Sequence, residues 1–489
     1  MIKKLSFTLF FLTIFSLILI GISLFSFFNS ATESSLQWQA VCWVAYLIVF
    51  ILFVRSCILT FGYFDLRLAP LYSVVFFIIP RISALFFDML QSGISVHPIL
   101  QSRLVLTSSS FSGGLGLMLS GILLYIIGSF GNCYVKTNST LKIREKTKNF
   151  VDRIQQNSLS PKVLILLSIF CLAVYFIIIL YFFGGNISNL ALSVVDPVFM
   201  REITSKVTQS VFALPFSLSV MFSISAIFFA QKDSKKRIQK VALFLAVLQS
   251  VAIIPLGNRQ SVLFPLLLWI IVIGIKKRKI SFWKIVAILV CILLFVVLIA
   301  NIRYRSFRPD LNNFSPPNIM KSFTSELIMF DTFALILPSL LSGSIEYRLG
   351  GHLEDLKYFL PSFLLEDPKP YPADYQLSLQ LGIADYEPFG TPPTIFGGLL
   401  WNFGILGLML GSVFFGIIVY KLNIYLHNKM TFRRNSAGSY LLYGVVYIFL
   451  MDVVRVGVFM REILTLVIHV ISIIILSIFI KLSMFKAEK

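Results

Sequence analysis

Charged residues are scarce in this chain of 489 residues, at only 13% of the sequence. A soluble globular domain carries about 25%. Hydrophobic residues make up 57%, and the mean hydropathy is +0.88. A chain of this composition uses lipid as its solvent, and in lipid the backbone must satisfy its own hydrogen bonds. The sequence therefore predicts an all-α polytopic membrane protein.

Cysteine and histidine are also few, with five and four residues. The cysteines show neither the spacing of a metal site nor the framework of a disulfide-rich domain. No glycine-rich phosphate loop and no paired aspartate motif occurs on the side expected to face the cytoplasm, which disfavours nucleotide hydrolysis and nucleotide-sugar donors. We expect neither a metal nor another cofactor.

Apolar runs long enough to cross a bilayer, at about 20 residues each, recur along the chain. We predict about 12 transmembrane helices, at Leu5–Phe28, Gln39–Thr60, Leu68–Phe87, Phe111–Gly131, Val163–Phe183, Gln209–Ala230, Lys240–Pro255, Ser261–Ile275, Ile285–Ile302, Thr394–Tyr420, Gly438–Gly457 and Glu462–Leu482. Ser261–Ile275 is short for a span, so the turn before it, with Arg259, is expected at or below the membrane interface.

The basic stretches 136–162, 232–240 and 276–284 would all lie on one side of such a bundle. Because short cytoplasmic loops are enriched in Lys and Arg, both termini are expected in the cytoplasm. The net charge of +20 is then explained by orientation beside an anionic leaflet, and no nucleic acid is expected as a partner.

The segment 303–393 is expected to form one large extracytoplasmic loop between residues 1–302, with nine spans, and 394–489, with three. Residues 302–393 hold 11 of the 22 acidic residues and 11 of the 19 prolines. Within it, Leu327–Leu341 is short and interrupted by Asp331 and Pro338, which predicts an interfacial or re-entrant helix. Apolar residues in Leu353–Leu365 recur at helical spacing and predict an amphipathic helix.

Arginines gather near the expected outer face from separated parts of the chain. A guanidinium binds phosphate oxygens in pairs and stays charged, so a cluster beside lipid suits a lipid-linked phosphate or pyrophosphate. The candidates are Arg81, Arg259, Arg303, Arg305, Arg308, Arg455 and Arg461. Two simpler explanations stay open: Arg259 could reach the headgroups as an interfacial anchor, and Arg455 could pair with Asp452, three residues earlier on the same helical face.

The loop also carries candidates for acid–base chemistry and sugar binding. His352 stands beside Glu354 and Asp355, and one of the three could take a proton from a hydroxyl; a helix-capping polar run is the alternative. Tyr371, Asp374 and Tyr375 combine aromatic rings with a carboxylate, which suits sugar binding but also occurs in ordinary structured loops. Glycines 397, 398, 404, 407 and 411 after the loop predict close helix packing.

Several of these short stretches resemble the Wzy family of O-antigen and enterobacterial common antigen polymerases. They are Asp355-x-x-Tyr358-Phe359-x-Pro361-Ser362, Thr391-Pro392-Pro393-Thr394, Gly397 to Gly407 with Asn402-Phe403-Gly404, Gly257-Asn258-Arg259, and Arg455-Val456-Gly457. The arrangement of spans and large loop resembles the family over most of the chain. Individual residues match only in these short stretches. The assignment of the general base to His352 or its acidic neighbours has no clear match in the family pattern.

The resemblance implies a metal-independent membrane glycosyltransferase of the GT-C type. Such an enzyme joins undecaprenyl-pyrophosphate-linked oligosaccharide units at the outer face of the bacterial inner membrane. Arg259 and Arg455, which match the family pattern, would hold the donor pyrophosphate. Whether a polysaccharide chain-length regulator also binds is left open.

Two other functions fit the same layout. An O-antigen ligase, which transfers finished glycan to the lipid A core of lipopolysaccharide, is barely separable from a polymerase by these residues. A transporter or flippase of lipid-linked oligosaccharides would also suit twelve spans. The large loop and the lack of a visible repeat argue against the transporter.

Overall fold

The structure is a computed structural model of the chain. The described residues are 2–29, 32–92, 94–96, 105–131, 160–186, 188–189, 210–230, 235–253, 259–277, 327, 329–348, 373–382, 392–432, 437–457 and 460–487. They divide into two compact units. The first comprises Met1–Val135, Ile319–Ile424 and Leu450–Ile463, and the second comprises Lys136–Asn318, Tyr425–Phe449 and Leu464–Lys489.

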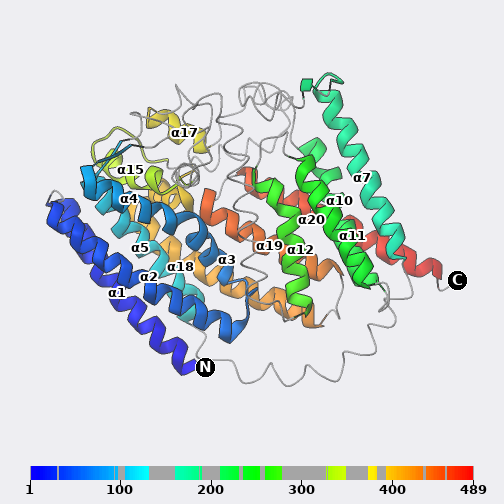
Figure 1. The fold of residues 1–489 in the computed structure, drawn as a ribbon, viewed down its shortest axis with the longest axis horizontal. Helices are drawn as coiled ribbons and strands as arrows, with labels where there is room; N and C mark the ends of the chain where they lie inside the picture. The colour runs from blue at the N-terminus through cyan, green and yellow to red at the C-terminus, as the bar shows by residue number, and fades with distance from the viewer. Residues whose placement is uncertain are drawn as a thin grey trace. The chain divides into compact units, whose positions relative to one another are not determined.

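The first unit is built on long helices from the N-terminal part of the chain (Figure 1). They are α1 Ile2–Phe28, α2 Glu33–Phe61, α3 Leu68–Ser73, the π-helix η1 Val74–Ile78, α4 Ile79–Ser92 and α5 Ser108–Phe130. Helix α1 packs against both α2 and α5. Between α4 and α5, strands β1 Ile94–Val96 and β2 Val105–Thr107 form an antiparallel pair, with Ser95 opposite Leu106.

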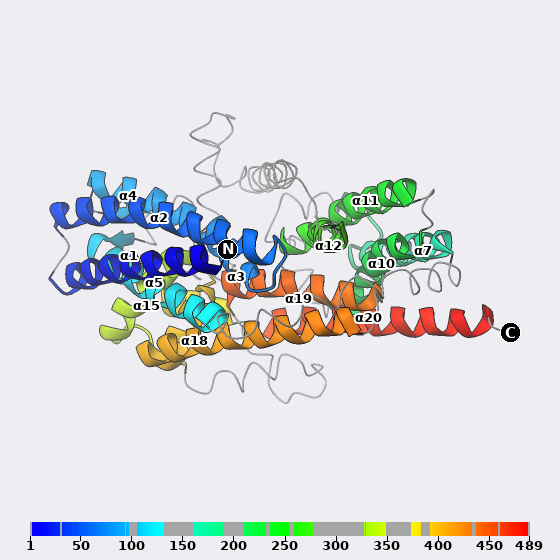
Figure 2. The ribbon, with the colours of Figure 1, turned by 90° about the horizontal axis from the view of Figure 1, so that it is seen from below.

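Later segments of the chain complete this unit. Helix α15 Met329–Leu341 packs on α5, and α17 Ala373–Gln380 is a short helix. Helix α18 Thr394–Phe432 contributes its residues up to Ile424 and lies beside α5 in both views (Figures 1 and 2). Leu450 onward in α19 Ala437–Val456, and the start of α20 Met460–Ala487, also belong here.

Helix α5 is the centre of the first unit, because nearly all of its residues from Phe111 to Phe130 are buried. Glycines let its neighbours approach closely. A Cβ on Gly121 would lie 2.6 Å from the Phe396 ring of α18, and a Cβ on Gly114 would overlap Ala334 of α15. Gly128 of α5 meets Gly416 of α18 main chain to main chain. Such small residues are how helices approach closely in membranes.

The second unit is a separate helical assembly. It holds α7 Pro161–Phe182, α10 Ser210–Phe229, α11 Lys235–Ala252 and α12 Arg259–Lys277, with parts of α18, α19 and α20. Helix α10 packs on α7 and α11, and α11 packs on α12. Its apolar core includes Tyr175, Val220 and Leu268.

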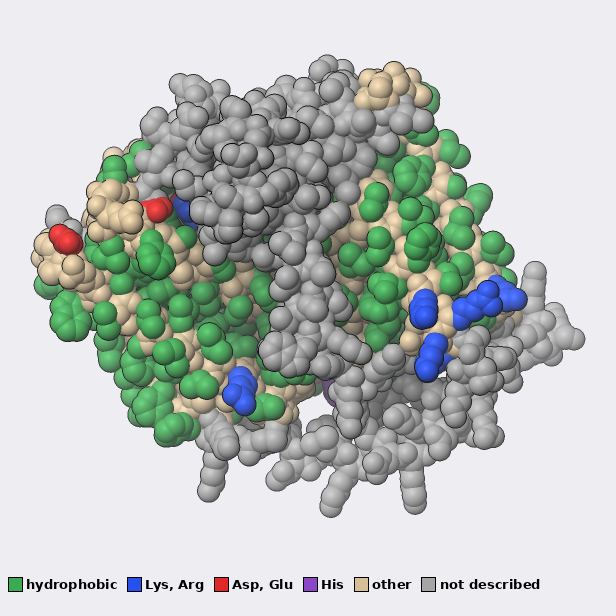
Figure 3. Space-filling model, in the orientation of Figure 1, with side chains coloured by type: hydrophobic (Ala, Val, Ile, Leu, Met, Phe, Trp, Pro, Cys, Tyr) green, Lys and Arg blue, Asp and Glu red, His purple; other side chains and the backbone are tan. Residues whose placement is uncertain are grey.

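The outward surfaces of both units are apolar. Phe25 of α1, Leu59 of α2 and Phe170 of α7 are each more than 60% exposed. In Figure 3 hydrophobic side chains cover the visible flanks of the described helices. Monomeric soluble proteins rarely expose apolar patches of this extent. The chain is an all-α polytopic membrane protein, as the composition predicts.

Eight helices in the described part of the chain are long and apolar enough to cross a membrane. They correspond to α1, α2, the continuous α3–η1–α4 segment, α5, α7, α18, α19 and α20. Helices α10, α11 and α12 occupy three further predicted spans, but their apolar stretches are shorter or charged at one end. The predicted span Ile285–Ile302 lies outside the described residues, and so does the predicted amphipathic helix Leu353–Leu365. The count of twelve stays a prediction.

Two predicted elements need correction. The short apolar run predicted at Ser261–Ile275 is confirmed as Val262–Ile275 of the 19-residue helix α12, but Arg259 is the first residue of that helix rather than part of a turn. The single span predicted at Thr394–Tyr420 is two helical pieces, because Gly404 has φ +68° and breaks the helix. Helix α15 is a short apolar helix, as predicted for Leu327–Leu341, and it is largely buried against α5.

The predicted close packing at the glycines after the loop is only partly observed. Gly397 does contact another helix, since its Cβ would lie 3.1 Å from Phe333 of α15. Gly407 and Gly411 instead meet Phe403 and Leu399, which belong to α18 itself on the other side of the break at Gly404. Their role is to let the two pieces of α18 pack on each other.

Candidate functional site

The candidate residues fall into three groups by what the structure describes. His352, Glu354, Asp355, Arg303, Arg305, Arg308 and Tyr371 lie outside the described residues. Arg259, Asp374 and Arg461 lie in α12, α17 and α20, with only their backbone described. Arg81, Arg455 and Tyr375 are described with their side chains. Arg259 belongs to the second unit and the other described candidates to the first.

Arg81 forms a buried ion pair with Asp331. Its Nε donates to Asp331 Oδ2 at 2.7 Å, its Nη2 donates to Oδ1 at 2.6 Å, and both side chains are 2% exposed. The pair joins α4 to α15 across 250 residues of sequence. A guanidinium already engaged by a carboxylate in this geometry is suited to anchoring α15. The substrate-binding role of Arg81 stays a prediction, and the geometry favours a structural one.

Arg455 is more open than Arg81. Its Nε donates to Asp452 Oδ1 at a longer distance, 3.3 Å, and its side chain is 20% exposed. The Arg455 guanidinium carbon lies 5.5 Å from the centre of the Phe77 ring. The local pair with Asp452 therefore exists, and the arginine also rests on an aromatic face.

Phe77 belongs to the π-helix η1, four residues before Arg81. The Ile79 N–H bonds to Val74 O, five residues back, and Pro80 follows with no N–H of its own. Such single-turn π segments often occur at functional sites. Phe77 of η1 contacts Arg455 of α19, and Arg81 of α4 contacts Asp331 of α15. Neighbouring turns of this segment thus contact two different helices.

A third arginine, Arg348, was not among the sequence candidates. Its backbone N–H donates to Trp401 O at 3.2 Å, and Trp401 Nε1 donates back to Glu346 O at 3.0 Å. Arg348 Nε donates to Gln376 Oε1 at 3.0 Å, and its guanidinium lies 5.4 Å from the Trp401 ring centre. Arg348 is 8% exposed. It ties the end of the α15 segment to α17 and α18, and no local pattern in the sequence identifies it.

The hydrogen bond from Arg348 to Gln376 fixes the position of α17, which carries two of the predicted sugar-binding residues. Tyr375 is half-buried beside Gln376, the residue that accepts from Arg348, and Asp374 precedes it in the same helix. Tyr371, two residues before α17, is not described. The structure thus brings α17 to the start of α18, where the motif Asn402-Phe403-Gly404 lies.

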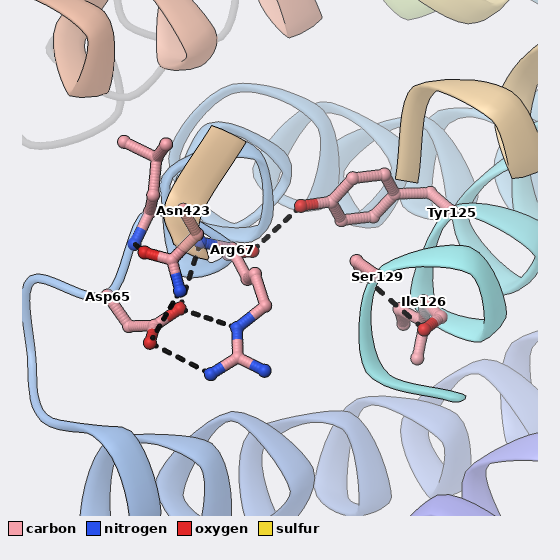
Figure 4. A network of polar contacts seen from close by, with 7 residues as sticks. Asp65, Arg67, Tyr125, Ile126, Ser129 and Asn423 are labelled. Carbon is pink, nitrogen blue, oxygen red and sulfur yellow. Dashed lines mark hydrogen bonds and ion pairs between the residues drawn. The ribbon is translucent and has the colours of Figure 1, made fainter. Parts of the chain in front are cut away.

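A separate polar network holds the segment between α2 and α3 (Figure 4). Asp65 accepts from Arg67 Nε at 2.7 Å and from Nη2 at 2.9 Å, and Asn423 Nδ2 donates to Asp65 Oδ2 at 3.3 Å. Tyr125 of α5 donates its hydroxyl to Arg67 O at 2.8 Å. The Arg67 guanidinium lies 3.9 Å from the Phe61 ring centre. These hydrogen bonds connect α18 and α5 to the segment before α3. The charge of Arg67 is balanced by the Asp65 carboxylate.

The second unit has a buried polar interior of its own. Ser217 on α10 lies 2.7 Å from His469 Nδ1 on α20, and the His469 ring stacks on Phe264 at 4.0 Å. Gln249 Nε2 lies 2.8 Å from Ser219 Oγ, whose hydroxyl donates to Ser168 O. These contacts join α7, α10, α11, α12 and α20. We interpret them as interhelical hydrogen bonds that hold the unit together in lipid.

The described residues contain no group of three His, Cys, Asp or Glu placed to hold a metal ion. Comparison with known protein families, with curated proteins and with solved structures gives no match to this chain. Its function must therefore be inferred from its own residues and from the resemblance in the short motifs.

Proposed function

We propose that this protein is a polymerase that joins undecaprenyl-pyrophosphate-linked oligosaccharide repeat units into a surface polysaccharide. The proposal places it in the bacterial inner membrane, with both termini in the cytoplasm and residues 303–393 on the outer side. The observation that carries it is Arg455, a partly exposed arginine at the end of an apolar helix and within a motif that resembles the Wzy polymerases.

The reaction needs no cofactor, because the glycosyl pyrophosphate supplies the free energy. The terminal hydroxyl of one lipid-linked unit attacks the anomeric carbon of the growing chain. A new glycosidic C–O bond forms, the anomeric C–O bond to phosphate breaks, and undecaprenyl pyrophosphate leaves with the electron pair. The hydroxyl proton passes to a basic side chain.

In this mechanism Arg455 stabilises the charge that develops on the leaving pyrophosphate, and the same role for Arg259 stays a prediction. Arg303 or Arg305 assists them, and Arg461, at the start of α20, is a further candidate for binding the substrate phosphates. His352, Glu354 or Asp355 takes the proton. Arg81 is assigned to the anchoring of α15, because its charge is already matched by Asp331.

The test is deletion of the gene in its host, followed by gel analysis of the surface polysaccharide. A polymerase deletion converts a ladder of chain lengths into a single repeat unit on the acceptor. Complementation with Arg455→Ala or Arg259→Ala should fail to restore the ladder. Complementation with Arg55→Ala is the matched control, since Arg55 is an exposed arginine within α2, and it should restore the ladder fully.

Other outcomes identify the alternatives. Long polymer that accumulates on the lipid carrier, with no glycan attached to its acceptor, would indicate a ligase. Single lipid-linked units trapped at the cytoplasmic face would indicate a flippase. An Arg455→Ala protein that is present in the membrane and restores a normal ladder would refute the role assigned to Arg455.

A further inference from the structure

One side of α11 is exposed and changes from basic to apolar along the helix. Its first two turns expose three basic side chains, those of Lys236, Arg237 and Lys240. The exposed residues that follow are all apolar and recur at the spacing of one helical face. They are Leu243, Phe244, Val247, Leu248 and Val251. The opposite side of α11, with Ala246 and Gln249, is buried in the second unit.

The three basic side chains have no carboxylate to balance them in the described part of the chain. The ion pairs between described residues all lie in the first unit. Lys240 is four residues from Lys236 and three from Arg237, so the three charges are neighbours on one face. Like charges at this spacing destabilise a helix. An anion bound between them would remove that repulsion.

Helices α7 and α11 begin on the same side of the second unit. Gln249 Nε2 of α11 donates to Ser168 Oγ of α7 at 3.3 Å, and the Tyr175 hydroxyl of α7 donates to Ala252 O of α11 at 3.3 Å. Residue numbers therefore increase in the same direction along the two helices. The basic start of α11 lies at the end of the unit where α7 begins with Pro161 and Lys162.

The contact between Gln249 and Ser168 gives the level of the basic residues relative to lipid. Lys162 is the only charged residue of α7 and lies about 9 Å before Ser168, so it marks the edge of the hydrocarbon layer. Lys240 lies about 13 Å before Gln249, and Lys236 about 20 Å. The basic residues of α11 are thus about 4–10 Å outside the level of Lys162. Lipid headgroups occupy this zone, and long basic side chains reach into it.

We propose that the exposed side of α11 binds an anionic glycerophospholipid. Its phosphate lies at Lys236, Arg237 and Lys240, and its acyl chains lie along the apolar residues that follow. Lysine and arginine donate charge-assisted hydrogen bonds to phosphate oxygens, and basic clusters beside a membrane helix attract anionic lipids. A nucleic acid or an acidic protein would match the basic residues but leave the apolar ones uncovered. The proposal does not depend on the polymerase function.

The experiment titrates the full-length protein in detergent, at low ionic strength, with phosphatidylglycerol or with phosphatidylcholine of the same acyl chains. Native mass spectrometry counts the bound lipids. The triple variant Lys236→Gln, Arg237→Gln and Lys240→Gln removes the three charges and keeps polar side chains that suit a helix. The control variant Lys421→Gln with Lys481→Gln removes two exposed lysines, one from α18 and one from α20.

The wild type and the control variant should bind their first phosphatidylglycerol more tightly than phosphatidylcholine. The triple variant should bind it roughly 100-fold more weakly and phosphatidylcholine equally well. A charge-conserving variant, Lys236→Arg with Arg237→Lys and Lys240→Arg, should keep the preference. Each protein should elute as a single monodisperse peak. If the triple variant does not, the single variant Lys240→Gln, expected to bind roughly fivefold more weakly, decides the question.

Three results would overturn the proposal. The first is an unchanged preference for phosphatidylglycerol in the triple variant and in Lys240→Gln. The second is an equal loss of preference in the control variant, which would show that positive charge anywhere on the protein suffices. The third is a wild-type protein that binds the two lipids equally. The polymerase function stands or falls separately, by the complementation experiment.

Discussion

The ion pair between Arg81 and Asp331 makes a quantitative prediction about stability. Substitution Arg81→Ala leaves the Asp331 carboxylate buried, 2% exposed, without the guanidinium that gives it two hydrogen bonds of 2.6 and 2.7 Å. Removal of one partner of a buried pair costs about 3–5 kcal/mol. At about 1.4 kcal/mol per tenfold change, the equilibrium constant for the packing of α15 falls by roughly two to three and a half orders of magnitude.

This prediction can be measured by heating the purified protein and following its elution by fluorescence. Arg81→Ala should lose its monodisperse peak at a clearly lower temperature than the wild type, and Asp331→Ala should behave in the same way. The double variant Arg81→Met with Asp331→Leu should recover most of the loss, because an apolar pair leaves no charge buried. Arg55→Ala, which changes an exposed arginine of α2, should match the wild type.

Two results would refute this reasoning. If Arg81→Ala is as stable as the wild type, the ion pair does not anchor α15. If the double variant is no more stable than Arg81→Ala, the loss does not come from an unpaired buried charge. In that case Arg81 would have to act through a contact other than Asp331, and its predicted role in substrate binding would regain support.

Three further predictions concern helix packing in the first unit. Gly128→Leu should abolish the monodisperse peak, since its side chain would overlap the main chain of α18, whereas Gly131→Leu, in open space, should leave elution unchanged. Gly404→Ala should lower stability by about 1–3 kcal/mol, measured as a lower unfolding temperature, because a φ of +68° with a ψ of −164° is a backbone conformation that essentially only glycine adopts. Asp65→Ala should cost about 3 kcal/mol in the same assay by leaving Arg67, 5% exposed, without its carboxylate; an unchanged unfolding temperature would show that the network in Figure 4 contributes little.

Hydropathy predicted where the helices lie better than where they end. Described helices occupy eleven of the twelve predicted spans, but α2 begins at Glu33 rather than Gln39 and α20 continues to Ala487 rather than Leu482. The apolar run marks the part of a helix that lies in lipid. Helical hydrogen bonding continues into polar flanks, which hydropathy does not detect.

Contacts between residues far apart in the chain could not be predicted from the sequence. Asp331 appeared only as an interruption of an apolar run, because its partner Arg81 lies 250 residues away. The break at Gly404 was not predicted either, since glycine is common within membrane helices and only the backbone angle distinguishes a kink. Arg348 was missed because its contacts with Gln376 and Trp401 come from two other helices.

The environments of the described arginines bear directly on which of them can serve chemistry. Arg67 and Arg81 each donate to both oxygens of one carboxylate and are nearly inaccessible to solvent. The charge of each is therefore balanced by an aspartate within the protein. Arg455 donates to Asp452 at a longer distance of 3.3 Å, and a fifth of its side chain is exposed. An anionic substrate gains most from a cation that is partly desolvated and still reachable. By the exposure of its side chain, Arg455 is the best candidate of the three for the proposed pyrophosphate site, and the complementation experiment tests that proposal.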